Sequence, residues 1–75
     1  MSVKTIERVT HVPNNLKLWG ADTVGTRVVY DSEYSEFCVY FYIDSVRHPD
    51  HDYYTNDKDD AIGTAKAMRN TYNNV

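Results

Sequence analysis

The chain has 75 residues, a formal net charge of −3 and a single cysteine, Cys38. This length allows one domain, residues 1–75, which buries only roughly 60% of its unfolded surface, so the core must be small. A single cysteine cannot form an internal disulfide. The acidic net charge disfavours direct nucleic-acid binding. The longest apolar run, Phe37–Ile43, is too short to cross a membrane. We therefore expect a soluble cytoplasmic protein in a reducing compartment.

The N-terminal half predicts three strands separated by turns. Residues Val3–Val12 favour a first strand, although the apolar residues there are spaced by three instead of alternating. Pro13–Asn15 indicates a turn, because proline fixes φ and asparagine tolerates left-handed backbone. Leu16–Trp19 alternates apolar and polar residues and predicts a short second strand. A third strand is expected over Thr26–Asp31, after a loop in which Gly25 permits a bulge or a tight turn.

The strongest strand is predicted over Phe37–Ile43, after a polar connection of hairpin length at residues 31–35. Side chains of a strand alternate between two faces. One face therefore carries Phe37, Val39, Phe41 and Ile43, and the other carries Cys38, Tyr40 and Tyr42. The first set is the more apolar and should meet the helix, which leaves the second set on an uncovered face.

A helix is predicted from residue 57 to residue 72, after a loop at 47–52 and a short extended segment at Tyr53 and Tyr54. Asn56 or Asp57 should cap it, and residues from Thr71 onward should fray. One stripe of the helix carries Ala61, Ala65, Met68 and Tyr72. The expected fold class is α+β: a three- to four-stranded, mainly antiparallel sheet with one C-terminal helix packed on one face.

An acidic segment precedes and opens this helix. It contains five of the eleven acidic residues, Asp50, Asp52, Asp57, Asp59 and Asp60. Counted from Asp50, the sixth residue is Thr55 instead of glycine and the twelfth is Ala61 instead of glutamate, so no EF-hand is present. The segment indicates either helix capping with a solvated loop or an acidic contact surface for a basic partner.

Metal, cofactor and catalytic signals are weak. His48 and His51 form an H-x-x-H pair on an exposed loop, but no further ligand completes a metal site, so we expect no metal and no cofactor. The chain contains no G-x-S-x-G, no phosphate-binding glycine loop and no H-E-x-x-H. Cys38 lies within a strand, where a thiol behaves as a small hydrophobic group. We therefore expect no enzymatic activity.

The seven tyrosines allow two interpretations. In the first, Tyr30, Tyr40, Tyr42 and Tyr72 pack in the core or in cross-strand pairs. In the second, Tyr40 and Tyr42 stand on the uncovered face together with Tyr30 or Tyr53, as an aromatic patch bordered by acids, and such a patch marks an interface.

The run Asp52-Tyr53-Tyr54-Thr55-Asn56-Asp57-Lys58-Asp59-Asp60-Ala61-Ile62-Gly63-Thr64-Ala65 resembles the C-terminal pattern of short uncharacterised bacteriophage proteins. In those proteins an aromatic-aromatic-Thr strand end leads through acidic caps into an alanine-rich helix. The resemblance implies no activity and no catalytic residue. It implies binding to a host protein in the cytoplasm of the host cell.

Together these observations predict a non-enzymatic protein-binding module, a phage-type inhibitor or modulator of a host protein. The expected contact residues are those of the tyrosine face and the acidic helix start: Tyr40, Tyr42, Tyr53, Asp50, Asp52, Asp57, Asp59 and Asp60. The alternative is an acidic nucleic-acid mimic that blocks a DNA- or RNA-binding host protein. A homodimer through Tyr40 and Tyr42 is a further expectation, because one patch then serves both subunits.

Overall fold

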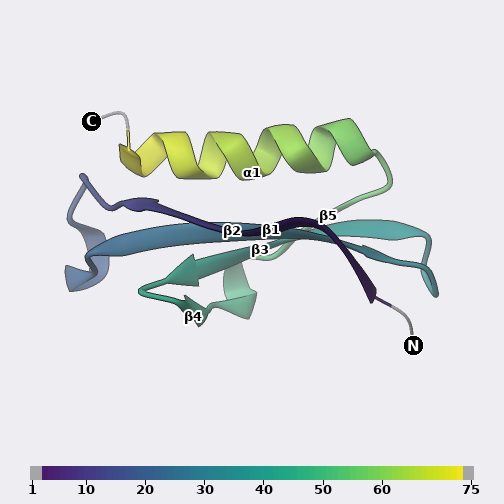
Figure 1. The fold of residues 1–75 in the computed structure, drawn as a ribbon, viewed down its shortest axis with the longest axis horizontal. Coiled ribbons are helices and arrows are strands. Elements are labelled where there is room, and N and C mark those ends of the chain that lie inside the picture. Colours follow the sequence, from purple (N-terminus) through teal and green to yellow (C-terminus); the bar gives the residue numbers. More distant parts are fainter. Residues whose placement is uncertain (1–2, 74–75) are drawn as a thin grey trace.

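The computed structural model describes residues 3–73, which form an antiparallel sheet with one long helix across one face (Figure 1). The strands are β1 (Val3–Pro13), β2 (Thr23–Asp31), β3 (Glu36–Ile43), β4 (Val46–Arg47) and β5 (Tyr53–Thr55). The helices are α1 (Lys58–Asn73) and two short 3-10 helices, η1 (Leu18–Gly20) and η2 (Pro49–His51). The strand order is β1-β2-β3-β4, and β5 also pairs with β3. This architecture confirms the predicted α+β fold class.

Strand β1 carries two register irregularities that explain its imperfect alternation. Its pairing with β2 shifts twice between Thr5 and Thr10. A bulge adds a residue to one strand and so offsets the alternation of faces beyond it. As a result Ile6 and Val12 both pack against the core, whereas Val9, midway between them, is exposed.

The prediction of a strand at Leu16–Trp19 is wrong. Lys17 and Trp19 have φ angles of 60° and 57°, in a left-handed region that a strand does not adopt. The buried side chain of Asn14 holds this loop, because its amide nitrogen donates hydrogen bonds to two backbone carbonyls of residues 18 and 21, at 2.8 and 3.1 Å. The segment is therefore a tight loop that enters η1.

Gly25 lies inside β2, which begins at Thr23, and not in a turn before the strand. It pairs with His11 of β1. A Cβ atom at this position would lie 2.6 Å from His11 Nδ1 and 2.9 Å from the carbonyl oxygen of Thr10. Glycine is therefore required here by the close approach of the neighbouring strand.

Helix α1 begins where the sequence predicts. Asp57 is its N-cap, since Asp57 Oδ1 accepts hydrogen bonds from the backbone N–H groups of Asp59 and Asp60, at 2.9 and 3.2 Å. The helix continues to Asn73, past the residue Thr71 from which fraying is predicted, and residues 74–75 lie outside the described part. No helix within residues 3–73 is long and apolar enough to cross a membrane.

The core lies between α1 and the sheet. Ala61 and Ala65 are fully buried against Val28 and Val39, because small side chains let the helix approach the sheet closely. At the other end of the helix, Met68 and Tyr72 pack against a second group of buried residues, Ala21, Val24, Phe41 and Ile43. The predicted apolar stripe of the helix and the predicted apolar face of β3 therefore do meet.

Candidate binding site on the open sheet face

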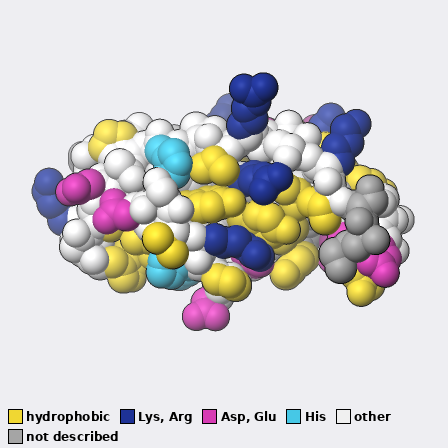
Figure 2. Space-filling view, turned by 60° about the horizontal axis from the view of Figure 1, so that its bottom comes forward, with side chains coloured by type: hydrophobic (Ala, Val, Ile, Leu, Met, Phe, Trp, Pro, Cys, Tyr) yellow, Lys and Arg dark blue, Asp and Glu magenta, His cyan; other side chains and the backbone are white. Residues whose placement is uncertain are grey.

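The sheet face opposite α1 is called here the open sheet face. Tyr40 and Tyr42 lie on it together with Cys38, as predicted from their alternation with the core residues. The register places Arg27 of β2 beside Tyr40 on the same face. Figure 2 views the molecule from this side and shows a hydrophobic area among which Lys and Arg side chains lie.

Arg47 is a residue of this face that the sequence analysis missed. Residues 44–45 have φ angles of 49° and 70°, as in a type I′ turn, and this turn folds β4 back onto β3. Arg47 consequently pairs with Tyr42, and its guanidinium carbon lies 3.9 Å from the ring centroid of Tyr40. Asp52 forms an ion pair with Arg47. The sequence signal for this hairpin was the pair of β-branched residues Ile43 and Val46, which are separated by two residues. Those two residues are Asp-Ser, a weaker signal for a hairpin turn than Asn-Gly.

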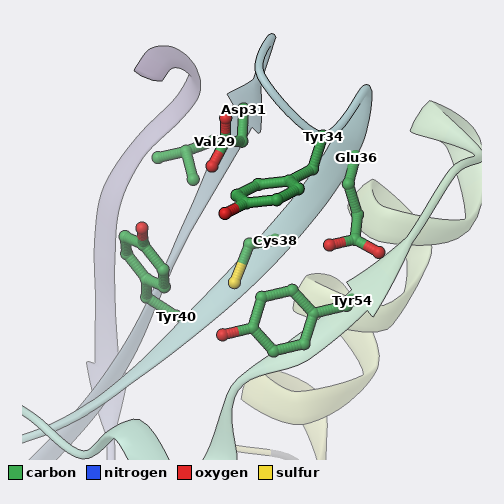
Figure 3. A pocket seen from close by; sticks show the side chains of 7 residues that line it. All are labelled: Val29, Asp31, Tyr34, Glu36, Cys38, Tyr40 and Tyr54. Carbon is green, nitrogen blue, oxygen red and sulfur yellow. The ribbon is translucent and has the colours of Figure 1, made fainter. Parts of the chain in front are cut away.

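A pocket of about 310 Å³ opens on this face (Figure 3). It is called here the tyrosine pocket, and it is lined by Val29, Asp31, Tyr34, Glu36, Cys38, Tyr40 and Tyr54. Figure 3 shows the rings of Tyr34, Tyr40 and Tyr54 arranged around the Cys38 thiol. These rings come from the β2–β3 turn, from β3 and from β5, so three separate segments build the walls.

The walls of the tyrosine pocket are exposed and its floor is buried. Tyr34 is 70% exposed and Tyr54 is 58% exposed, whereas Val29 and Cys38 are only 1% and 4% exposed. The aromatic rings therefore shield the apolar floor while remaining in water themselves. Tyr34 and Tyr54 together form an exposed aromatic area at the mouth of a pocket, and such an area favours a contact with another molecule.

Two carboxylates lie at the rim of the tyrosine pocket. Asp31 and Glu36 pair directly across β2 and β3, and like charges in that position repel each other. Neither forms an ion pair with any residue of the described range 3–73. Asp31 Oδ1 accepts a hydrogen bond from the backbone N–H of Glu33, at 2.9 Å. The rim therefore carries negative charge that the described part of the chain does not neutralise.

The floor of the pocket is electrically neutral. Burial, with a smaller contribution from the nearby carboxylate of Asp52, raises the pKa of the Cys38 thiol from 9.0 to about 11. The thiol is therefore protonated near pH 7. A protonated, buried thiol is a poor nucleophile, so Cys38 serves as apolar surface beneath the rings.

Tyr30 and Tyr53, one of which the second interpretation placed beside Tyr40, lie on the helix side instead. Tyr30 forms a cross-strand pair with Phe37, as the first interpretation has it. The ring of Tyr30 contacts that of Phe37, with centroids 4.8 Å apart. The hydroxyl of Tyr53 donates a hydrogen bond to Asp60 Oδ2 of α1, at 2.7 Å. The face of each tyrosine depends on its strand register, and in β5 that register turns Tyr54, not Tyr53, toward the pocket.

The acidic residues predicted as contacts divide between two places. Asp52 lies beside the tyrosines of the open sheet face, where it pairs with Arg47 and accepts a hydrogen bond from the Tyr54 hydroxyl at 3.4 Å. Asp57 and Asp60 make their hydrogen bonds at the start of α1, in the helix layer. Asp50 and Asp59 are exposed. The carboxylates that border the tyrosine pocket are Asp31 and Glu36, which the sequence analysis did not single out because nothing in their local pattern distinguishes them from other surface acids.

One histidine of the loop pair, His51, packs against aromatic rings. The ring of His51 lies 5.2 Å from that of Phe41 and 6.0 Å from that of Trp19. Residues 3–73 contain no group of three or more His, Cys, Asp or Glu side chains that could hold a metal ion.

Comparisons of the chain with protein-family models, with curated proteins and with solved structures gave no match. The resemblance to short bacteriophage proteins therefore stays a prediction.

Proposed function

We propose that this chain is a non-enzymatic protein-binding module whose contact surface is the open sheet face. The observation that carries the proposal is the exposure of Tyr34 and Tyr54 beside a pocket on that face. Tyrosine is enriched at protein interfaces because it buries a large amphipathic area and loses little conformational entropy. Arg27 and Arg47 add charged groups beside the aromatic area, which suits a specific contact more than nonspecific adhesion.

The action on a host protein, as an inhibitor or modulator in the host cytoplasm, is proposed from the resemblance to short phage proteins. The acidic start of α1 lies in the helix layer, away from the open sheet face. A partner would have to reach around the sheet edge to touch both surfaces. We therefore propose the open sheet face as the main contact and the acidic helix start as a secondary one.

The alternative, an acidic nucleic-acid mimic, has less support. A mimic presents its carboxylates to a basic groove as phosphates would be presented. Asp52 is compensated by its ion pair with Arg47, whereas Asp50, Asp57, Asp59 and Asp60 are exposed and have no ion pair within residues 3–73. Four carboxylates around the start of one helix supply only a short stretch of the charge that a nucleic acid carries.

Capture from a bacterial lysate at low and at high salt tests both functions. In one variant Tyr34→Ser is combined with Tyr54→Thr, and in the other Asp50→Asn is combined with Asp59→Asn; circular dichroism checks that each remains folded. The proposal expects capture that survives high salt and disappears only in the tyrosine variant. Capture that is lost at high salt and in the acidic variant would establish mimicry instead, because charge-driven contacts are screened.

A second copy of the chain is the other occupant that could cover this face. Sedimentation of the wild type and of a Tyr40→Lys, Tyr42→Lys variant separates the two cases. A dimeric wild type that becomes monomeric in the variant would show that the face serves self-association, and a monomeric wild type leaves the face free for another protein.

A further inference from the structure

We propose that the tyrosine pocket binds a methylated ammonium group. If the open sheet face contacts a protein, as the proposed function has it, that group is a methylated lysine side chain of the partner. The pocket itself can be tested without knowing the partner.

The walls of the pocket have the chemistry that binds such cations. The face of an aromatic ring carries partial negative charge and attracts a cation held above it. Tyr34, Tyr40 and Tyr54 line one space, and Figure 3 shows the rings of Tyr34 and Tyr54 on opposite sides of the Cys38 thiol. Because Arg47 already stacks on the ring of Tyr40, Tyr34 and Tyr54 supply the rings that are free to hold a ligand cation. A volume of about 310 Å³ suits a small head group more than a large ligand.

The rim supplies the opposite charge. Asp31 and Glu36 repel each other across the strand pair, and a cation between or near them would relieve that repulsion. Two cations lie beside Tyr40 on this face: Arg47, which is compensated by its ion pair with Asp52, and Arg27, which donates a hydrogen bond to the Thr5 hydroxyl. Neither lines the pocket, so the charged groups of its lining are the carboxylates of Asp31 and Glu36.

The floor selects between types of cation. Val29 and the protonated Cys38 thiol offer little to accept hydrogen bonds from a ligand. A primary ammonium group has three N–H donors that lose their water partners on entry, which is costly. A methylated ammonium group keeps the charge but has fewer donors or none, so it enters such a pocket more easily.

The same sheet face already contains one cation held in this way. The guanidinium group of Arg47 lies over the ring of Tyr40 and pairs with Asp52. A ring and a carboxylate together hold a cation there, and the tyrosine pocket combines the same two elements with more rings and no internal cation. The tyrosine pocket thus offers a ligand the same combination of aromatic ring and carboxylate that holds Arg47 within the fold.

Nuclear magnetic resonance of the 75-residue chain tests the pocket directly. The ligand is choline chloride, and the control is 3,3-dimethyl-1-butanol, which has the same shape without the charge; ionic strength is held constant. Choline should shift the amide signals of Tyr34, Glu36, Cys38 and Tyr54 with a Kd on the order of 1 mM, and the alcohol should bind at least about tenfold more weakly. No saturable shift, or equal affinity for the two compounds, overturns the proposal.

Matched variants locate the effect. Tyr34→Leu keeps an apolar side chain and removes the ring, so choline should bind about fivefold more weakly, whereas Tyr34→Phe should retain affinity. Glu36→Gln should also weaken binding, and Glu33→Gln, an exposed acid of the same turn that does not line the pocket, should leave it unchanged. Tyr34 is 70% exposed in a turn, so these changes spare the core. Equal affinity in Tyr34→Leu and Tyr34→Phe would exclude the ring as the binding group.

A short peptide containing trimethyllysine, compared with the same peptide containing lysine, identifies the source of the ammonium group. Preference for the trimethylated peptide supports a protein ligand, and choline binding without peptide binding assigns the pocket to a free amine. If the wild type binds choline but the Tyr34→Ser, Tyr54→Thr variant still captures the lysate protein, the ammonium site stands and the protein contact through these tyrosines is overturned. If the variant loses capture and the wild type does not bind choline, the protein contact stands and the ammonium site is overturned.

Discussion

Tyr54 lies directly opposite Cys38 in the register of β5 with β3, so the third wall of the tyrosine pocket comes from a strand of three residues near the end of the chain. The other two walls come from β3 and the turn before it. The pocket therefore exists only when β5 has been added to the sheet edge. A one-residue shift of β5 that placed Thr55 opposite Cys38 would remove this ring and open the site.

Gly25→Ala should destabilise the protein by about 1–3 kcal/mol, because the added methyl group meets His11 and the β1 backbone within a packed sheet. Gly63→Ala is the matched control. Nothing lies within 4 Å of a Cβ at position 63, which is exposed on α1, so this change should stabilise by roughly 0.5–1 kcal/mol. Urea denaturation of both variants measures the two effects, and equal effects would contradict the close approach of β1 at Gly25.

Asp57→Ala should lower the free energy of unfolding by about 1 kcal/mol, since two backbone N–H groups of α1 lose their acceptor. Thermal denaturation should show a fall in Tm of roughly 4–8 °C for a chain of this size. Asn56→Ala serves as the control and should change Tm much less. A larger fall in Tm for Asn56→Ala than for Asp57→Ala would show that Asp57 is not the N-cap.

Asn14→Ala should destabilise more than Asn15→Ala. The buried Asn14 amide donates to two backbone carbonyls, and removing it leaves them without that donor, at a cost of about 1–3 kcal/mol. The exposed Asn15 amide donates to one carbonyl, that of Asn73. Denaturation curves of the two variants measure this difference. Equal losses of unfolding free energy would show that the burial of the Asn14 side chain adds nothing to stability.

The stability of the wild type should fall more steeply than that of Cys38→Ala as the pH rises from 9 to 11. The folded-state pKa of the thiol is about 11 and its ordinary value is 9.0, so in this window the unfolded chain loses the thiol proton while the folded chain keeps it. Ionisation of the thiol then favours the unfolded state. The contribution of the neutral thiol to the free energy of unfolding is therefore fully present only below about pH 9. Unfolding free energies at several pH values test this; parallel curves for the two proteins would contradict a buried thiol.

Much of the fold follows from local periodicity in the sequence. The alternation of residues 37–43 determined which side chains face the helix, and the spacing of Ala61, Ala65, Met68 and Tyr72 determined which side of the helix faces the sheet. Helix capping by Asp57 is equally local, because the capping carboxylate and the backbone N–H groups that donate to it lie within three residues. These features can be predicted because they depend only on the backbone geometry within a single strand or helix.

The candidate site depends on relationships that no single segment contains. Tyr54 and Arg47 reach the open sheet face only because β5 and β4 pair with β3 in one particular register, and a shift of one residue would turn each side chain away. The loop at Leu16–Trp19 departs from its strand-like pattern in a left-handed conformation, in which the ring of Trp19 contacts those of Phe41 in β3 and Tyr72 in α1. The sequence by itself determined the two layers and their facing sides; the tertiary structure decided where the tyrosine pocket forms, because strand register and side-chain hydrogen bonds between segments are settled only when the segments pack together.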